Sequence, residues 1–407
     1  MAHDLRFAVP AAALAAIALA VSPAAAADMN GPGVTKTQIT LGQTMPYSGP
    51  ASAYGAIGKA EAAYFQMIND EGGINGRKIK LISLDDGYSP PKTVEQTRKL
   101  VEEDHVLAAY SGLGTPTSTA VHKYLNHKKV PQLFLATGAT KWGNYKQFPW
   151  TMGWQPTYQG EGKIYAHYIL KNMPNAKIAI LYQNDDYGKD YLKGFTDGLG
   201  AAGKKMIISE VTYETSDPTV DSQIVTLKGS GADVFFDVTT PKFAAQAIRK
   251  VFDSGWKATH FLNNVSASVG AVLKPAGLEK SQGIISANYM KDPSDPQWQK
   301  DDDYKAFMAW MKKYDPNADP SDTFNVYGYM NAQTMVQVLK QCGNDLSRAN
   351  VMKQAANLKN FHPGMLLPGI NINTSPTDYY PIEEEQLIKF EGTRFVPFGE
   401  ILSSAGS

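Results

Sequence analysis

Two short loops of glycine and hydroxyl residues are the part of this sequence best suited to bind a small anion. The first reads SGLG over residues 111–114 and precedes Thr115, and the second reads TGAT over residues 137–140. Thr115 has the side chain of a helix N-cap, and the free N–H groups of a helix start attract anions. Neither loop contains a charged residue. We expect the hydroxyls of Thr115 and Thr140 to bind a carboxylate; the simpler alternative is a capped helix and an ordinary connecting loop.

Each of these loops follows an apolar run of the length and composition of a buried strand. The runs are Val106–Tyr110 and Val130–Ala136, and the segment between them has the apolar face of a helix. Two neighbouring parallel strands end at the same edge of their sheet, which is where open α/β sheets bind ligands. The sequence therefore predicts that both loops lie at one ligand-binding edge.

Strands and helices alternate along most of the chain. From Ile39 to Thr140 the predicted order is βαβαβαβ, and a second series of the same kind extends from Gly160 to Leu262. Such alternation is typical of parallel sheets covered by helices on both faces, so we expect two similar α/β lobes. The last third differs: it contains two predicted helices, Tyr304–Lys313 and Val326–Lys340, and then a predicted hairpin over residues 386–398.

Composition excludes several classes of function. The 407 residues contain 39 Lys and Arg and 39 Asp and Glu, so no net basic charge favours nucleic acid.

Residues 1–27 combine Arg6, an apolar run and a small-residue cleavage site, which predicts a signal peptide and export. Cys342 is the only cysteine, so an internal disulfide is impossible, and its helical surroundings predict a packed thiol.

No motif supports an enzyme. The glycines at 112 and 114 are not followed by the third glycine of a dinucleotide fingerprint, and no G-x-S-x-G or H-E-x-x-H motif occurs. We therefore expect no catalysis, no cofactor and no metal site, with a nucleotide-dependent enzyme as the remote alternative. His122 and His127 lie on a polar helix end and are expected to be solvated, as is the acidic run Glu383–Glu385.

A set of ordered landmarks closely resembles the leucine/isoleucine/valine-binding protein family, which are type I periplasmic solute-binding proteins of ABC transporters. The landmarks are Ser48-Gly49-Pro50, Tyr54-Gly55, the segment GGINGR at 72–77, Asp85-Asp86, Ala139-Thr140 and Asp186-Tyr187-Gly188. The resemblance implies two doubly wound parallel-sheet lobes joined by three crossovers, with the ligand between them. It places lobe one at 36–153 plus 288–365 and lobe two at 154–287 plus 366–407.

The resemblance also assigns ligand-binding positions in both lobes. The aromatic that lines the cleft matches Tyr54, the tyrosine that closes over the ligand matches Tyr187, and Thr239 lies where the family commonly has an aromatic. The family's disulfide pair is missing, with Tyr88 and Gly114 near its positions. The expected ligand-binding residues are Tyr54, Leu113, Gly114, Thr115, Ala139, Thr140, Tyr187, Thr239 and Asn264, with Trp154 and Gln155 as candidates by location at the first crossover.

One departure from the family pattern bears on the ligand. Amino-acid binders place an acidic residue after the strand that corresponds to Phe261–Leu262, where it pairs with the ligand's ammonium, but this chain has Asn263 and Asn264. Burying an ammonium without its counter-charge costs several kcal/mol. We therefore predict a small carboxylate or amide without a free α-amine, such as an aromatic acid stacked near Tyr54, Tyr187 or Trp154.

Two alternatives stay open. A branched-chain amino acid is possible if Tyr182, Asp185 or Asp186 reaches its amine. A sensory receptor would use the same cleft but report the ligand to a different membrane partner. The expectation is a monomeric periplasmic protein that delivers its ligand to the permease of an ABC importer.

Overall fold

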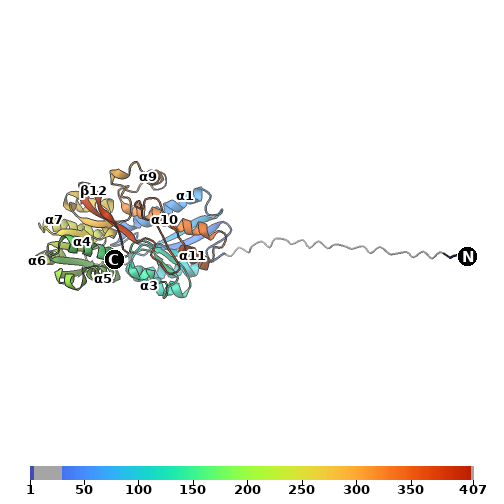
Figure 1. Ribbon diagram of the computed structural model, residues 1–407, viewed down its shortest axis with the longest axis horizontal. Coiled ribbons are helices and arrows are strands. Elements are labelled where there is room, and N and C mark those ends of the chain that lie inside the picture. Colours follow the sequence, from blue (N-terminus) through green and yellow to red (C-terminus); the bar gives the residue numbers. More distant parts are fainter. Residues whose placement is uncertain (4–29, 405–407) are drawn as a thin grey trace.

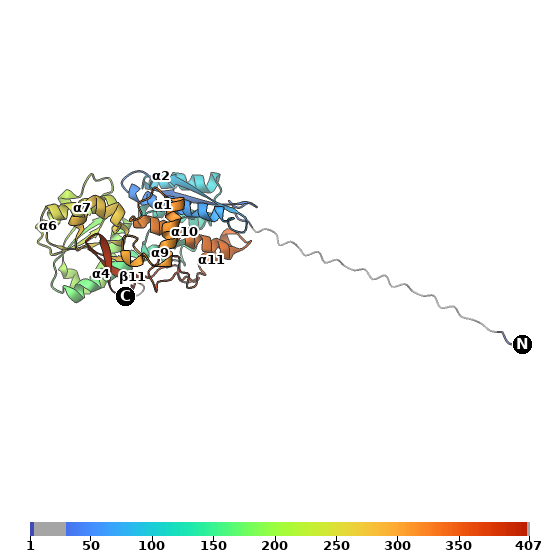
Figure 2. The ribbon, with the colours of Figure 1, turned by 90° about the horizontal axis from the view of Figure 1, so that it is seen from above.

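The computed structural model describes residues 1–3 and 30–404, so the predicted signal peptide lies almost entirely outside the described residues. Figures 1 and 2 show two parts side by side along the long axis. Helices α1, α3, α10 and α11 belong to one part and α4–α7 to the other. No described helix is both long and apolar enough to cross a bilayer.

Lobe one is built on a five-stranded parallel sheet with the order β2-β1-β3-β4-β5. Its central strand β1 pairs with β2 in continuous register, from Gln38 opposite Lys78 to Met45 opposite Asp85. The predicted alternation is confirmed, and β5 is an additional strand. The elements are β1 (Gln38–Met45), α1 (Gly55–Asp70), β2 (Lys78–Asp85), α2 (Pro90–Arg98), β3 (Ala108–Tyr110), α3 (Thr115–His127), β4 (Gln132–Leu135) and β5 (Thr151–Gly153).

Lobe two is built on a seven-stranded sheet with the order β12-β11-β10-β9-β8-β6-β7. Strands β6 to β10 are parallel, and the predicted C-terminal hairpin adds β11 and β12 as antiparallel strands. The elements are α4 (Tyr158–Asn172), β6 (Ile178–Gln183), α5 (Asp186–Gly203), β7 (Ile207–Tyr213), α6 (Asp221–Gly229), β8 (Val234–Val238), α7 (Pro241–Asp253), β9 (Thr259–Leu262), α8 (Lys274–Ala276), β10 (Ile285–Asn288), β11 (Glu384–Glu391) and β12 (Arg394–Ser403).

The chain crosses between the two sheets three times, after β5, after β10 and before β11. Between the second and third crossings it forms α9 (Asp302–Tyr314), α10 (Thr323–Cys342) and α11 (Arg348–Ala355). Helix α10 is buried along most of its length, because it packs directly on α1 in lobe one. This is the predicted architecture of two doubly wound lobes with a triple crossover.

The hydrophobic core of lobe one includes residues beyond the expected boundary at 365. Leu366, Ile372 and Ile382 are fully buried in the same cluster as Ile39 and Leu133 of the first sheet. These contacts group 366–382 with lobe one, whereas we expected that segment in lobe two. We propose a division into 36–153 plus 288–382 and 154–287 plus 383–407.

His122 and Glu385, which we expected to be solvated, are both buried. His122 packs against Trp142 and Phe148, and this burial lowers its pKa to about 4. Glu385 points into lobe two from β11 with 1% of its surface exposed, because alternate residues of that strand face the core. Cys342 is buried in α10, as predicted.

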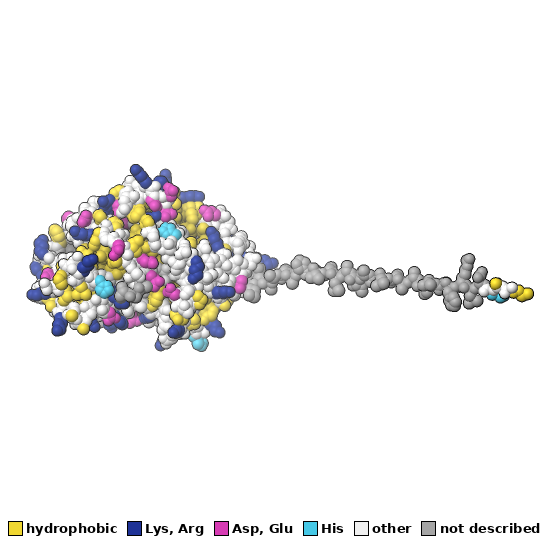
Figure 3. Space-filling view, viewed as in Figure 1, with side chains coloured by type: hydrophobic (Ala, Val, Ile, Leu, Met, Phe, Trp, Pro, Cys, Tyr) yellow, Lys and Arg dark blue, Asp and Glu magenta, His cyan; other side chains and the backbone are white. Residues whose placement is uncertain are grey.

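Charged side chains of both signs are scattered over the visible face in Figure 3.

Candidate ligand-binding site

A small cavity lies between the lobes, at the carboxyl ends of strands from both sheets. Leu113 and Ala136 follow β3 and β4 in lobe one, and Thr240 and Asn264 follow β8 and β9 in lobe two. The volume of the cavity is about 50 Å³. The cavity is therefore at the place where doubly wound sheets bind ligands, and its size suits a small molecule.

The cavity wall is aromatic and uncharged. Six tyrosines and Phe324 line it, and none of its 18 lining residues is Asp, Glu, Lys, Arg or His. Burial raises the pKa of the Tyr54, Tyr88 and Tyr187 hydroxyls well above their ordinary value, so all three are neutral at physiological pH. A ligand here meets ring faces, hydroxyls, amides and backbone groups, with no ionic partner on the wall.

The start of α3 is a place on the wall that is organised for an anion. The first helical hydrogen bond runs from the Ser118 N–H to the Gly114 carbonyl at 3.1 Å. Among the described residues, the N–H groups of Thr115 and Thr117 consequently have no backbone acceptor, and no acidic side chain caps this helix. These donors and the helix dipole favour a negative group beside the Thr115 hydroxyl.

Gly114, and not Thr115, occupies the cap position of α3, which corrects our expectation. Its φ of 96° is a conformation that residues with a Cβ rarely adopt. A Cβ at Gly114 would also lie 2.4 Å from a ring carbon of Tyr88. Thr115 is then the first helical residue, and its hydroxyl is 2.6 Å from that of Thr137. Tyr88 packs against Gly114 near the positions of the family's disulfide pair, which this chain lacks.

Tyr54 joins the two lobes across the cavity. It is the last residue of a short turn, Ser52–Tyr54, before α1, and its ring packs on Phe324 with 4.9 Å between centroids. Its hydroxyl donates to the Val265 carbonyl of lobe two at 3.0 Å. Farther from the cavity, Lys141 and Asp186 form an ion pair between the lobes at 2.7 Å. The structure therefore shows the two lobes in contact around the site.

A buried carboxylate stands behind the lobe-two wall. Glu161 of α4 accepts the Asn264 N–H at 2.7 Å and the hydroxyls of Tyr165 and Tyr191 at 2.7 and 2.5 Å. Burial raises its pKa to about 7. Glu161 thus holds the turn that carries Asn264 and Val265, but it is not itself part of the cavity wall.

Comparison with known proteins identifies the family. The family model described as periplasmic binding protein matches residues 38–378. This protein belongs to the periplasmic binding protein family. It is 28% identical over 225 residues to Leu/Ile/Val-binding protein homolog 3 of Brucella melitensis; the match covers 54% of this chain and 59% of that relative.

Two solved structures share the fold of this periplasmic binding protein. One is a branched-chain amino acid ABC transporter protein from Thermus thermophilus with bound valine, with a TM-score of 0.82, 15% identity, and coverage of 91% and 98% of the two chains. The other is a solute-binding protein of an ABC transporter from R. palustris in complex with benzoate, with a TM-score of 0.74, 20% identity, and coverage of 89% and 96%. At these identities the likeness establishes the fold alone.

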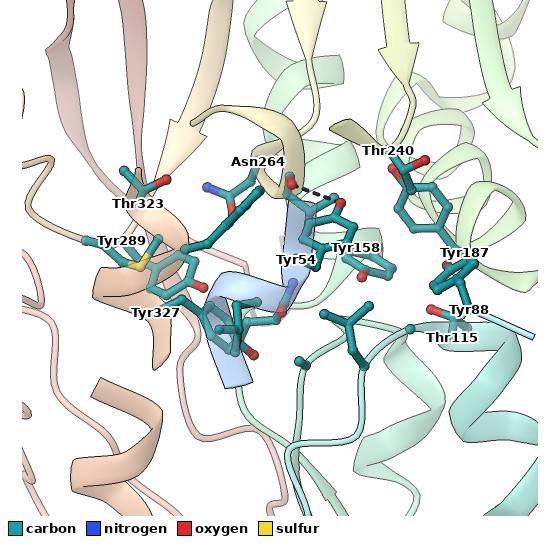
Figure 4. Close-up of a pocket in the computed structure, with 18 residues that line it drawn as sticks. Tyr54, Tyr88, Thr115, Tyr158, Tyr187, Thr240, Asn264, Tyr289, Thr323 and Tyr327 are labelled. Atoms are coloured by element: carbon teal, nitrogen blue, oxygen red, sulfur yellow. Dashed lines mark hydrogen bonds between the residues drawn. The ribbon is translucent and has the colours of Figure 1, made fainter. Parts of the chain in front are cut away.

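The structure brings together most of the site residues expected from the sequence of this periplasmic binding protein. Figure 4 shows Tyr54 between the side chains of the two lobes, with Thr115 and Tyr187 on one side of the pocket. Whether they contact a ligand stays a prediction. The expected residues on the wall are Tyr54, Leu113, Gly114, Thr115, Gln155, Tyr187 and Asn264.

Four expected site residues, Ala139, Thr140, Trp154 and Thr239, lie off the cavity wall. The Thr140 N–H and hydroxyl donate to Asp190 at 2.7 and 2.9 Å, so this hydroxyl does not join that of Thr115. The Thr239 hydroxyl donates to Asp237, and its neighbour Thr240 lines the cavity instead. Trp154 and Ala139 are packed into hydrophobic clusters, and the Trp154 indole N–H donates to Thr334 at 3.0 Å.

Sequence reasoning missed several wall residues. Tyr88 and Ala136 follow the ends of β2 and β4, so the rule that found Leu113 could have found both of them. The residues after β10 and at the start of α10 had no local signal. The missed residues are Ile57, Tyr88, Ala136, Tyr158, Thr240, Val265, Tyr289, Met290, Thr323, Phe324 and Tyr327.

Proposed function

We propose that this periplasmic binding protein binds a small carboxylate without a free α-ammonium and delivers it to the permease of an ABC importer. The carboxylate would lie at the start of α3, where the Thr115 hydroxyl and unpaired N–H groups supply donors. The ligand's body would lie against the tyrosine rings. Delivery to an importer's permease would take place on the outer side of the cytoplasmic membrane, which agrees with the periplasmic binding protein family.

The observation that carries this proposal is the lack of an acidic group among the 18 residues that line the cavity. A bound amino acid would bury its ammonium there without a counter-charge, at a cost of several kcal/mol. Three acids outside the cavity wall are engaged elsewhere, including Asp185 and Asp186, which we named as possible partners of an amine. Asp185 caps α5 by accepting the Tyr187 N–H at 2.9 Å, Asp186 pairs with Lys141, and Glu161 lies behind the Asn264 turn.

An aromatic acid fits the wall better than an aliphatic one. Seven rings surround the cavity, and offset or edge-on contacts between rings add about 0.5–1.5 kcal/mol beyond burial of their area. The benzoate complex of the R. palustris protein, which shares this fold, supports the same choice. The names of the Brucella relative and the valine-bound Thermus protein support the alternative of a branched-chain amino acid.

A thermal-shift screen followed by calorimetry tests the proposal. The panel is benzoate, hexanoate, benzamide, leucine and valine, each at the same concentration. We expect the acids to raise the melting temperature, since a ligand at 100 times its Kd stabilises the folded state by about 2.7 kcal/mol. Tight binding of leucine or valine, with no binding of the acids or the amide, would contradict the proposal.

The transport role needs a separate test because a sensory receptor could use the same cavity. A purified ABC permease complex, reconstituted in proteoliposomes, should take up the labelled acid only when this protein is present. Pull-down of a membrane receptor and no uptake would favour the sensory alternative.

A further inference from the structure

Two hydroxyl groups on the cavity wall have no hydrogen-bond partner within the described part of the chain. They belong to Tyr289, which follows β10, and Thr323, which begins α10. Both residues are buried, with 1% and 5% of their surfaces exposed, and both line the cavity. Neither hydroxyl oxygen is itself fully enclosed by protein atoms, so both open onto the cavity. These two are therefore available to a bound molecule.

Tyr289 and Thr323 lie on the side of the cavity opposite the anion site. In Figure 4 they stand on the left, whereas Thr115 and Tyr187 stand on the right. Tyr54 lies between the two groups in the same view. A ligand whose carboxylate is beside Thr115 would extend past Tyr54 and place its other end near Tyr289 and Thr323.

This second end is unsuited to another negative charge. Thr323 is at the start of α10, where the Asp322 carboxylate already caps the helix by accepting the Phe324 N–H at 3.0 Å. The same Asp322 oxygen accepts the Ser268 hydroxyl at 2.9 Å. Because α3 has no acidic cap and α10 has one, a carboxylate prefers the α3 end, and a neutral group belongs at the α10 end.

We propose that the ligand is an aromatic acid with a neutral hydroxyl opposite its carboxylate, and that Tyr289 and Thr323 select for that hydroxyl. This inference rests on the proposed binding of a carboxylate. Both side chains can donate and accept, so together they satisfy the donor and the acceptor of a phenolic hydroxyl. A site built to hydrogen-bond a ligand hydroxyl rejects an analogue without one, because its own buried groups would stay unpaired.

Calorimetry with three matched acids tests this selection on the purified full chain. The probes are benzoate, 4-hydroxybenzoate and 4-methylbenzoate, whose methyl group has nearly the size of the hydroxyl but forms no hydrogen bond. We expect 4-hydroxybenzoate to bind at least tenfold more tightly than 4-methylbenzoate. In the double variant Tyr289→Phe with Thr323→Val the ratio should fall close to one, because 4-hydroxybenzoate loses its partners and 4-methylbenzoate no longer leaves two hydroxyls unpaired. Tyr168→Phe in α4, outside the cavity, is the control.

The outcomes separate this inference from the function on which it rests. If the acids bind but the unmodified protein shows no preference for the hydroxylated one, the inference is overturned and the carboxylate site stands. If leucine binds and none of the three acids does, both are overturned. A preference that persists unchanged in the double variant also overturns the role of Tyr289 and Thr323, and melting temperatures will show that this variant is folded.

Discussion

Removing the Tyr54 hydroxyl should weaken ligand binding by weakening closure of the lobes. In the structure this hydroxyl of lobe one donates to the Val265 carbonyl of lobe two at 3.0 Å, directly on the cavity wall. In an open form both groups would hydrogen-bond to water, so the bond favours only the closed form. Tyr54→Phe keeps the ring and its packing on Phe324, and therefore isolates the hydroxyl.

The expected loss of affinity has two sources. One neutral hydrogen bond is removed, and the Val265 carbonyl is left without its partner. Such a bond contributes about 0.5–1.5 kcal/mol net, and an unsatisfied buried acceptor costs about 1–3 kcal/mol. Tyr54→Phe should therefore weaken binding by about 1–3 kcal/mol, which is roughly 5- to 150-fold in Kd. Isothermal titration calorimetry with the acid that binds most tightly in the screen measures this change.

Tyr379→Phe is a matched control for this experiment. The Tyr379 hydroxyl also donates to a backbone carbonyl, that of Pro149 at 3.3 Å, but both residues are away from the cavity wall. It should lower stability slightly and leave Kd unchanged. Equal losses of affinity in both variants, or no loss in Tyr54→Phe, would refute the reasoning that this bond couples closure to binding.

Four other substitutions test the site and its support. Thr115→Val should weaken binding of an acid by about 1.5–3 kcal/mol, as expected for a hydrogen bond to a charged group, whereas Thr140→Val should not, because the Thr140 hydroxyl donates to Asp190; calorimetry of both variants checks this. Gly114→Ala should cost about 1–3 kcal/mol in urea unfolding, because the residue has φ 96° and its Cβ would meet the Tyr88 ring at 2.4 Å. Between pH 4.5 and 7, the free energy of unfolding should fall less steeply in Glu161→Gln than in the unmodified protein. Burial raises the pKa of Glu161, so its contribution to the stability of the folded state is complete below pH 4.5 and is lost as the pH rises through the raised pKa; a slope identical to that of the unmodified protein would contradict this.

The sequence by itself determined the fold and one half of the candidate site. Apolar runs of strand length alternate with segments that have the apolar face of a helix, and a parallel sheet covered by helices buries both kinds of surface. The strands expected at Val106–Tyr110 and Val130–Ala136 accordingly correspond to β3 and β4. The carboxyl-edge rule needs only local sequence, since each loop follows its own strand. It predicted the place of Thr115, which lies on the cavity wall, but also that of Thr140, which does not, whereas Leu113 and Gly114 were expected from the family resemblance.

Only the tertiary structure decided how distant segments meet. Tyr54 contacts Val265 across 211 positions of the chain, and Tyr289 and Thr323 reach the wall because a crossover and α10 pack against lobe one. Thr140 has the same residue type and a similar loop to Thr115, yet its hydroxyl turns to Asp190. Local preference fixes which residues end a strand, but the partner of each side chain depends on packing between elements far apart in sequence.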